Sequence, residues 1–346
     1  RSLADFADIY VNDDFPVAHR EHASVVGVTK FIPSYVGLNF AHEIEELNKT
    51  MQPESPSLFL LGGSKFSTKM PLVEKYSKQA LDHLYAISPE RVDPGRVDWD
   101  QKNTPRLYAG LTPEASKRTR EFYSTFCDNL IEVSSPEVAE AAKLFENTFR
   151  QVNIALVNEF AQISNALGIS VHETLEAANT KPYGFMKFNP SAGVGGHCIP
   201  VDPLYLTWWA QQNGQKAEFV ESADSINHAM PKYVAERALA MVDSSIRNPK
   251  VLLLGVAYKP GVGDVRETPV SELRDHLMTQ GAEVAWHDPL VVAWEGSKPV
   301  DLGWECDIAI LATKQPGMDI EALIARGILI LDCTNSLTNH PGATSL

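Results

Sequence analysis

Short apolar runs that alternate with helical stretches constrain the fold of this chain most strongly. Phe59-Leu60-Leu61 runs into Gly62-Gly63, and His83 to Ile87 forms a second short apolar run. Runs of this length that end in glycine or a loop predict buried strands. A helical stretch from about Lys69 to Asp82 lies between them, so the segment predicts a βαβ unit within an α/β protein.

The last third of the chain repeats this alternation. Lys250 to Leu254 predicts a strand that ends at Gly255, and a helix is expected from about Pro269 to Thr279. Further strands are expected at Glu283 to Trp286, Asp307 to Ala312 and Ile328 to Leu331. This order of elements predicts a small doubly wound sheet.

A long helix is predicted in the middle of the chain. Ser134-Ser135-Pro136-Glu137 combines a hydroxyl cap, a proline at the first helical position and an acid in the first turn. Apolar residues recur at helical spacing to about Leu167, where Gly168 is a suitable C-terminal stop. A helix of this length forms a spine between domains or packs against a second subunit, and it favours a dimer.

Composition excludes several classes of protein. The net charge of −14 over 346 residues argues against nucleic acid or an anionic membrane as partner. No apolar run is long enough to span a membrane. Arg1 to Asp5 shows no signal-peptide pattern, and the absence of a first methionine is compatible with a processed or excised piece. Four cysteines without metal-type spacing predict reduced thiols, a cytoplasmic protein and no metal site.

The segment before Cys198 is the most informative for function. Gly193, Gly195 and Gly196 lie within the six residues that precede it. Glycine allows positive φ and close approach of the backbone to a ligand. A helix N-terminus or a cation lowers the pKa of a thiol, and Pro200 and Pro203 are compatible with a helix that starts here. The segment predicts either a reactive thiol in a glycine-lined site or a tight structural turn.

Residues 181–206 resemble the cysteine segment of UDP-sugar 6-dehydrogenases, in the variant of enzymes that act on UDP-N-acetylhexosamines. Three more segments follow in that family's order: Ser88–Gly95 is similar to its acidic loop, Ser134–Asn147 to its lysine–asparagine helix, and Leu254–Glu267 to its UDP-binding domain. Lys187 and Asn189 stand where proline and tyrosine are more frequent, so the identity of the sugar stays open.

The resemblance implies oxidation of the sugar C6 alcohol to a carboxylate, with two NAD used in succession. Cys198 would attack the intermediate aldehyde, and the resulting thioester would be hydrolysed. Lys143 and Asn147 share one helix face and would stabilise an oxyanion. Asp202 would orient or deprotonate a water, and Glu90 would assist hydrolysis of the thioester. Without the resemblance, Lys143 is interpreted as a solvated lysine and Asn147 as a surface asparagine. Asp202 is then a helix cap, and Glu90 is an ordinary acid in a loop.

Substrate contacts are implied by the same resemblance. They are Arg91, Phe185, Asn189, Gly193, Gly195, Lys259 and Arg266. Lys259 and Arg266 would contact the nucleotide or the site of a partner subunit, and otherwise they are surface charges. Simpler members of the family carry a second glutamate four positions after Glu90, where this chain has Pro94.

A dinucleotide fingerprint is missing from the chain. Gly193-Val-Gly195 and Gly261-Val-Gly263 lack both the third glycine and the preceding strand. NAD is therefore implied by the resemblance alone. Three hypotheses stay open: a UDP-sugar dehydrogenase, a chain that binds UDP-sugar without turnover, and a purely structural chain without a ligand.

Residues from about Leu3 to Tyr85 resemble a different family, phosphoglycerate kinase. Tyr10–Ser24, Phe31–Gly37 and Leu60–Lys69 follow in that family's order. The resemblance implies that Arg20 contacts a phosphoglycerate and that Lys65 and Lys69 face nucleotide phosphates. Only the middle of a kinase is covered, so kinase activity is the enzymatic alternative and is not expected.

We expect a chimera whose parts are joined at equivalent strands. Its domains would be a kinase-like fragment (1–87), a remnant of the dinucleotide-binding domain (88–132), a central helical domain with Cys198 (133–235) and a UDP-binding domain (236–346). The predicted fold is α/β, with an incomplete or grafted Rossmann-like N-terminal region, a long central helical dimerisation domain and a C-terminal doubly wound domain. We expect the C-terminal part to fold as in its parent and the N-terminal graft to be makeshift. The expected partners are a UDP-sugar and a second copy of the chain.

Overall fold

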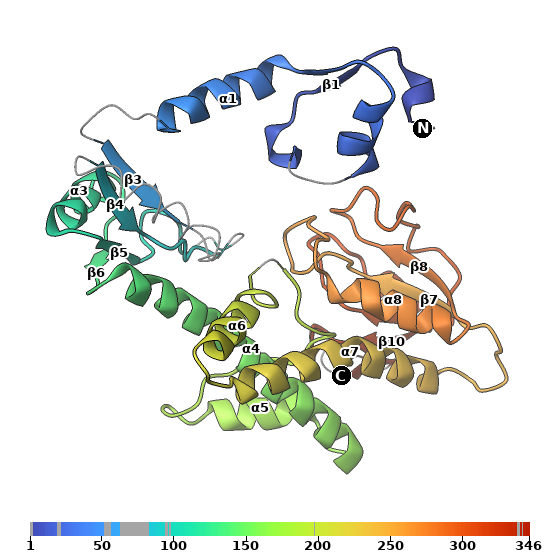
Figure 1. The fold of residues 1–346 in the computed structure, drawn as a ribbon. Coiled ribbons are helices and arrows are strands. Elements are labelled where there is room, and N and C mark those ends of the chain that lie inside the picture. Colours follow the sequence, from blue (N-terminus) through green and yellow to red (C-terminus); the bar gives the residue numbers. More distant parts are fainter. Residues whose placement is uncertain are drawn as a thin grey trace. The chain divides into compact units, whose positions relative to one another are not determined.

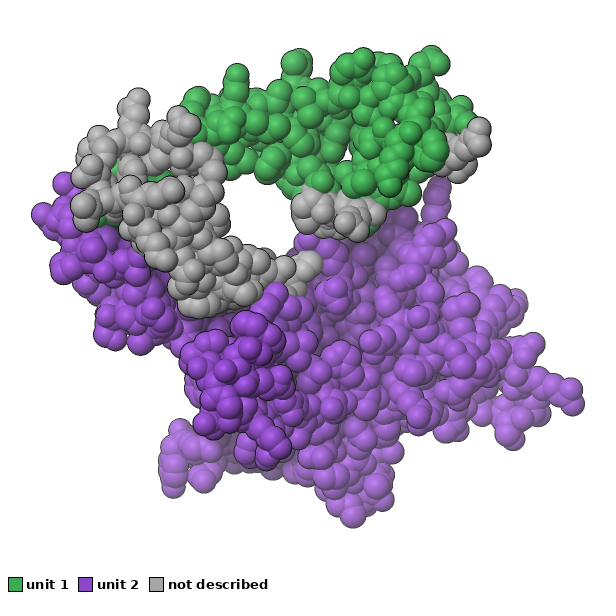
Figure 2. All heavy atoms as spheres, in the orientation of Figure 1, with its two compact units in different colours: residues 1–59, 76–84 green, residues 60–75, 85–346 purple. Residues whose placement is uncertain are grey.

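The computed structural model describes residues 3–18, 22–51, 57–62, 83–93, 96, 98–196, 198–337, 340 and 342–346. The chain divides into two compact units, which have different colours in Figure 2. The first unit comprises residues 1–59 and 76–84, and the second comprises residues 60–75 and 85–346.

The first unit is built from short elements. Strands β1 (Tyr10–Asn12) and β2 (Ser34–Val36) pair in parallel, and helix α1 spans Leu38–Met51. The Asp13 carboxylate accepts hydrogen bonds from the Asn39 amide at 2.9 Å and from the Phe40 backbone at 3.1 Å, which fixes the start of α1. Single turns of 3-10 or π helix complete the unit at Ala4–Phe6, Phe15–Val17, Ala23–Gly27 and Val28–Lys30.

A four-stranded sheet follows along the chain, in the order β3 (Ser57–Leu61), β4 (His83–Ile87), β5 (Arg106–Gly110) and β6 (Leu130–Glu132). Strands β4 and β5 are antiparallel, whereas β5 and β6 are parallel and are joined by α3 (Pro113–Tyr123). The strands predicted around Leu60 and from His83 to Ile87 are confirmed. The helix predicted from Lys69 to Asp82 lies outside the described residues.

Helix α4 (Pro136–Leu167) is the spine of the second unit, and it confirms the long predicted helix. The Ser135 side chain accepts from the Val138 backbone at its start, and Gly168 ends it with φ 69° in the left-handed region. Helices α5 (Val171–Asn179), α6 (Asp202–Gln212) and α7 (Glu218–Met241) pack against α4 (Figure 1). The predicted domain division at residues 235/236 falls inside α7, so this helix is shared by the two predicted domains.

The C-terminal sheet has five parallel strands in the order β11-β10-β9-β7-β8, which confirms the predicted doubly wound sheet. Val251 and Leu253 of β7 face one hydrophobic core, while Leu252 and Leu254 face another, and all four are fully buried. A parallel sheet covered on both faces needs apolar residues at every position, as here. The elements are β7 (Lys250–Leu254), α8 (Pro269–Thr279), β8 (Glu283–His287), β9 (Ile308–Leu311), α9 (Glu321–Ala325), β10 (Leu329–Asp332) and β11 (Ala343–Ser345).

Strand order in this sheet reverses between β9 and β7. The chain runs from β7 outward to β8, and then crosses back to β9 on the other side of β7. Loops at the carboxyl ends of two such strands diverge and leave a crevice, where ligands of open α/β sheets bind. Over the described part of the chain, no helix is long and apolar enough to cross a membrane.

Candidate active site

Cys198 is exposed and lies just before α6. Its carbonyl accepts hydrogen bonds from the backbones of Val201 at 3.1 Å and Asp202 at 2.7 Å. Asp202 is the first residue of α6 and is only 1% exposed, with Pro203 directly after it. The prediction of a helix start next to Cys198 is therefore confirmed.

Asp202 and Lys143 act on Cys198 through their charges, and Asn147 is hydrogen-bonded to Asp202. The Asn147 amide of α4 donates to the Asp202 carboxylate at 2.6 Å. Lys143, one turn earlier on the same helix face, is close enough for its charge to lower the pKa of the Cys198 thiol. Residues from two helices thus converge on the thiol.

The Cys198 thiol has a raised pKa in this arrangement. Partial burial of the sulfur within the exposed residue is the largest cause, the negative charge of Asp202 adds to it, and the cation of Lys143 opposes both. A helix start and a nearby cation are expected to lower this pKa, but the net shift is in the opposite direction. Partial burial of the thiol and the charge of Asp202 together outweigh the effect of Lys143.

The glycines before Cys198 allow close packing of two loops. Gly193 has φ 133° and Gly196 has φ 93°, which are backbone conformations that favour glycine. A Cβ at Gly193 would lie 2.8 Å from Pro269 Cβ, and a Cβ at Gly195 would lie 2.9 Å from the Glu267 carbonyl. The close approach is therefore to the start of α8 and the loop before it, which gives glycine a packing role here that was not predicted from the sequence.

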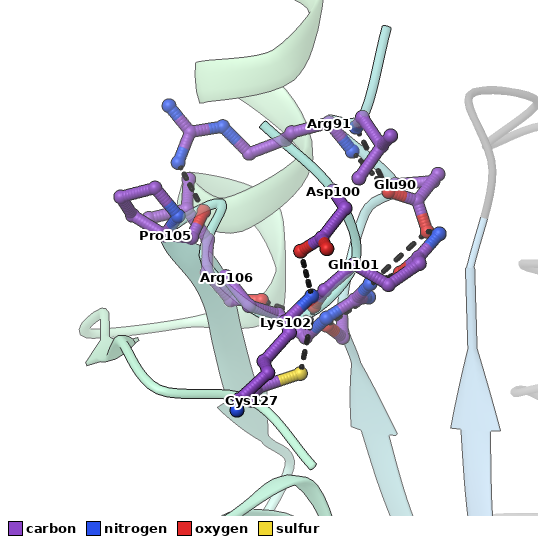
Figure 3. Close-up of polar contacts among 11 residues, drawn as sticks. Glu90, Arg91, Asp100, Gln101, Lys102, Pro105, Arg106 and Cys127 are labelled. Atoms are coloured by element: carbon purple, nitrogen blue, oxygen red, sulfur yellow. Dashed lines mark hydrogen bonds and ion pairs between the residues drawn. The ribbon is translucent and has the colours of Figure 1, made fainter. Parts of the chain in front are cut away.

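Glu90 in the acidic loop is held by four hydrogen bonds, which Figure 3 shows. One oxygen accepts from the backbones of Arg91 and Val92, and the other accepts from Gln101 at 2.9 Å and Arg106 at 3.0 Å. Burial raises the pKa of Glu90, but the bonds from Val92, Gln101 and Arg106 outweigh it and hold the pKa below its usual value. No hydrogen bond or ion pair among the described residues joins Glu90 to Cys198.

Arg91 connects the acidic loop to the spine helix. Its guanidinium forms a two-point ion pair with Glu146 of α4, at 3.1 and 2.5 Å, and donates to the Pro105 carbonyl at 2.8 Å. Glu146 directly precedes Asn147. The guanidinium of Arg91, a predicted substrate contact, is therefore held by two protein partners, one of which is the neighbour of Asn147 on α4.

A cavity of about 570 Å³ lies between the Cys198 loop, α4 and the C-terminal sheet. Its floor consists of residues that follow three strands: Tyr258 to Pro260 after β7, Ala312 to Lys314 after β9, and Cys333, Thr334 and Ser336 after β10. Four predicted substrate contacts line it, namely Asn189, Gly193, Gly195 and Lys259. The cavity occupies the position at which the strand order reverses.

Other predicted substrate residues lie elsewhere. Phe185 is 39% exposed, and Arg266 is paired with Asp264 at 2.7 Å; neither lines this cavity. The kinase-like candidates Arg20, Lys65 and Lys69 lie outside the described residues.

Several other polar residues that line the cavity were not predicted from the sequence. Arg150 follows Lys143 and Asn147 at helical spacing, so the face that carries those two residues could have revealed it. Four other lining residues follow predicted strands, namely Thr313, Lys314, Thr334 and Ser336. Only the order of those strands in the sheet shows that these residues line the same cavity. That order cannot be derived from the strand pattern alone.

Among the described residues, neither a dinucleotide-binding turn nor a group of metal ligands is present. None of the described strands is followed by a turn with the three glycines that bring a backbone close to a pyrophosphate. No group of His, Cys, Asp or Glu side chains suited to a metal ion occurs within the described part of the chain.

Comparison with known proteins matches three segments of the chain. Residues 137–229 match the UDP-glucose/GDP-mannose dehydrogenase family, central domain, and residues 252–339 match its UDP binding domain. Residues 1–87 match phosphoglycerate kinase. Both resemblances inferred from the sequence are confirmed.

Two curated relatives illustrate the match. A UDP-N-acetyl-D-mannosamine dehydrogenase of Methanococcus aeolicus is 36% identical over 230 residues, which are 66% of this chain and 51% of that protein. A UDP-N-acetyl-D-glucosamine 6-dehydrogenase of Pseudomonas aeruginosa is 37% identical over 65% of this chain and 54% of its own length. The chain spans about half the length of the curated relatives it matches.

Among solved structures, a UDP-D-ManNAc dehydrogenase from Pyrococcus horikoshii superposes with a TM-score of 0.74. The alignment covers 99% of this chain and 94% of that one at 23% identity, which supports the predicted α/β fold. The chain therefore carries two domains of the UDP-glucose/GDP-mannose dehydrogenase family, the central domain at residues 137–229 and the UDP binding domain at residues 252–339.

Proposed function

We propose that this chain binds a UDP-sugar in the 570 Å³ cavity, with the nucleotide over the C-terminal sheet and the sugar toward Cys198. The observation that carries the proposal is the position of the cavity. It lies where the strand order reverses, and residues of the Cys198 loop form its other wall. One elongated ligand can therefore reach both regions.

The proposed reaction is the one that the family resemblance implies, oxidation of the sugar C6 alcohol to a carboxylate. It needs two two-electron oxidations, for which NAD, the cofactor implied by the family, would accept each hydride. Between them, the Cys198 sulfur adds to the C6 aldehyde carbon to give a thiohemiacetal, whose oxyanion Lys143 and Asn147 stabilise, and the second oxidation converts this adduct to a thioester that water hydrolyses to the acid and the free thiol. Asp202, buried and hydrogen-bonded to Asn147, orients a water for release of the acid. The four hydrogen bonds to Glu90 use the acceptor positions of its carboxylate, which favours Asp202 over Glu90 in this role.

The proposed sugar is an N-acetylhexosamine. The curated relatives at 36% and 37% identity are named for UDP-N-acetylmannosamine and UDP-N-acetylglucosamine. The cysteine segment of this chain is also similar to that of enzymes of this type. Both sugars are therefore the ligands to test first.

Alkylation of Cys198 tests the proposal. We expect UDP-N-acetylmannosamine or UDP-N-acetylglucosamine to slow its modification by iodoacetamide at least about fivefold, since bound ligand shields the thiol. Peptide mass spectrometry would follow Cys198 and Cys306 in one sample, and Cys306 serves as the internal reference. If neither sugar nucleotide changes the alkylation rate or the melting temperature, the substrate site is not assembled.

Binding without turnover is a second candidate function. It is favoured by the lack of a dinucleotide-type turn among the described residues. NAD, the cofactor of the family, is proposed for the oxidation, and measuring NADH formation with each UDP-hexosamine separates the two candidates. Kinase activity remains the alternative suggested by the match at residues 1–87, and turnover of ATP with 3-phosphoglycerate decides it.

A homodimer is proposed through α4. Large apolar side chains recur along one stripe of this helix and are exposed: Phe145 66%, Phe149 43%, Leu156 58%, Ile163 47% and Leu167 67%. A stripe of this length matches a second copy of the same helix packed alongside it. Sedimentation of wild type and of Leu156→Glu/Ile163→Glu tests this, because a dimer would dissociate in the double variant.

We also propose that the chain is a chimera with the four domains predicted from its sequence. Support comes from the two families matched, phosphoglycerate kinase up to residue 87 and the dehydrogenase family from residue 137. The segment between them contributes β5 and β6 to the sheet that begins with β3 and β4. Limited proteolysis would identify cooperative boundaries and test the proposed divisions.

A further inference from the structure

The cavity concentrates positive charge in an acidic protein. Among the described residues that line it, Arg150, Lys259 and Lys314 are cations and Asp93 is the carboxylate. The whole chain carries a net charge of −14. A local excess of cations in such a chain attracts an anion to this position.

Lys259 is already engaged by the protein. Its ammonium group lies 2.7 Å from the Asp93 carboxylate, and both residues line the cavity. The pair contributes no net charge to the cavity. A phosphate that binds Lys259 must compete with a carboxylate that is already in place.

Arg150 and Lys314 differ from Lys259 in their contacts. Both are exposed, and neither takes part in a hydrogen bond or ion pair among the described residues. Arg150 extends the face of α4 that carries Lys143 and Asn147, and it lines the cavity together with residues of the Cys198 loop and of the C-terminal sheet. Thr313, next to Lys314, donates its hydroxyl to the Ala257 carbonyl at 2.9 Å and fixes the loop.

We infer that Arg150 and Lys314 bind the diphosphate of the nucleotide, while Lys259 stays paired with Asp93. A guanidinium can donate two parallel hydrogen bonds to phosphate oxygens, and an ammonium adds a mobile point charge. The inference rests on the proposed function. It replaces Lys259 and Arg266, the contacts implied by family resemblance, with two residues that the sequence did not single out.

Calorimetric titration with UDP and with uridine tests this assignment. We expect Arg150→Met and Lys314→Met each to weaken UDP binding about tenfold or more and to reduce its dependence on salt. Uridine, which lacks phosphate, should bind all variants within about twofold of wild type. Arg150→Lys keeps the charge and should recover part of the lost affinity.

Two controls match these variants. Asp93→Asn/Lys259→Met removes the existing pair without changing the net charge of the cavity, and Arg266→Met removes an exposed arginine outside it. Both should bind UDP within about twofold of wild type.

Wild-type-like UDP binding by both Arg150→Met and Lys314→Met would overturn the inference and leave the proposed function standing. If wild type binds neither UDP nor uridine, the proposed function itself fails, and the inference fails with it.

Discussion

The N-terminal strand pair and the C-terminal sheet differ in what covers them. In β2, all three residues are exposed, with Tyr35 at 60% and Val36 at 54%. In β7, Val251 to Leu254 are fully buried. Among the described residues of the first unit, only Val28 and Phe40 are buried apolar side chains, whereas the C-terminal sheet has an extensive core on each face.

This difference teaches that local signals can form a strand pair and a helix without burying enough apolar surface to make them stable. The first unit forms its strand pair and α1 from local signals, such as the Asp13 bonds to the start of α1. Two strands without further layers bury too little apolar surface to be stable alone. Its match to phosphoglycerate kinase ends at residue 87, and the matches to the dehydrogenase family begin at residue 137.

The largest expected effect comes from replacing one leucine in each region and comparing the losses of unfolding free energy. Leu253→Ala removes a fully buried side chain from β7 and should cost about 2–5 kcal/mol of unfolding free energy. Leu38→Ala at the start of α1, where the side chain is 89% exposed, should change it by less than about 0.5 kcal/mol. Urea denaturation measures both, and equal losses would mean that the first unit has a core of its own.

The second test uses the pH dependence of Cys198 alkylation. In the second unit, the charges of Asp202 and Lys143 act on this thiol. Asp202→Asn keeps the shape of the side chain and removes a charge that raises the pKa of Cys198. The pKa should fall, so the rise of the alkylation rate with pH should occur at lower pH. Lys143→Met removes a charge that lowers this pKa, so its profile should move to higher pH.

The two alkylation profiles must move in opposite directions. Profiles that coincide with wild type, with intact folding by circular dichroism, would show that neither charge acts on the thiol. The site described here would then not be assembled.

Glu90, near the junction of the two matched families, gives the smallest expected effect. The pKa of its carboxyl is lowered in the folded chain from its ordinary value of 4.5. The stabilisation it gives is therefore present above that value and is lost as the pH falls through the folded pKa. Glu90→Gln should cost no more than about 1 kcal/mol at neutral pH, because the side chain is 42% exposed.

Urea denaturation of wild type and Glu90→Gln at neutral and acid pH measures this effect. The difference between them should vanish at acid pH. Glu121→Gln, which breaks an exposed pair with Arg118, serves as the matched control and should cost about 0.3 kcal/mol or less. A difference for Glu90→Gln that persists at acid pH would assign its effect to packing rather than to charge.

Local signals predicted much of the fold. The cap at Ser135, the stop at Gly168 and the apolar runs of β7, β9 and β10 fix their elements within a few residues, because each depends on adjacent positions. The order of strands in the C-terminal sheet, and with it the position of the cavity, depends on tertiary packing. It could be expected only from the family resemblance.

The site was predictable to a similar degree. Lys143, Asn147, Asp202 and Cys198 were identified from motif resemblance, and contact or charge connects them. The raised pKa of Cys198 was not predictable, since it depends on the burial of the thiol and on the buried Asp202 carboxylate. The role of the loop glycines in packing also depends on a distant segment.

Hydrogen exchange measured by mass spectrometry, with and without UDP, tests the central comparison most directly. We predict that amides of β7, β9 and β10 exchange at least about a thousandfold more slowly than those of residues 34–51, a difference of about 4 kcal/mol in local stability. UDP should add protection at residues 255–263 and 312–316 and none at residues 3–51. Uniform protection across the first unit and the C-terminal sheet, unchanged by UDP, would contradict the account.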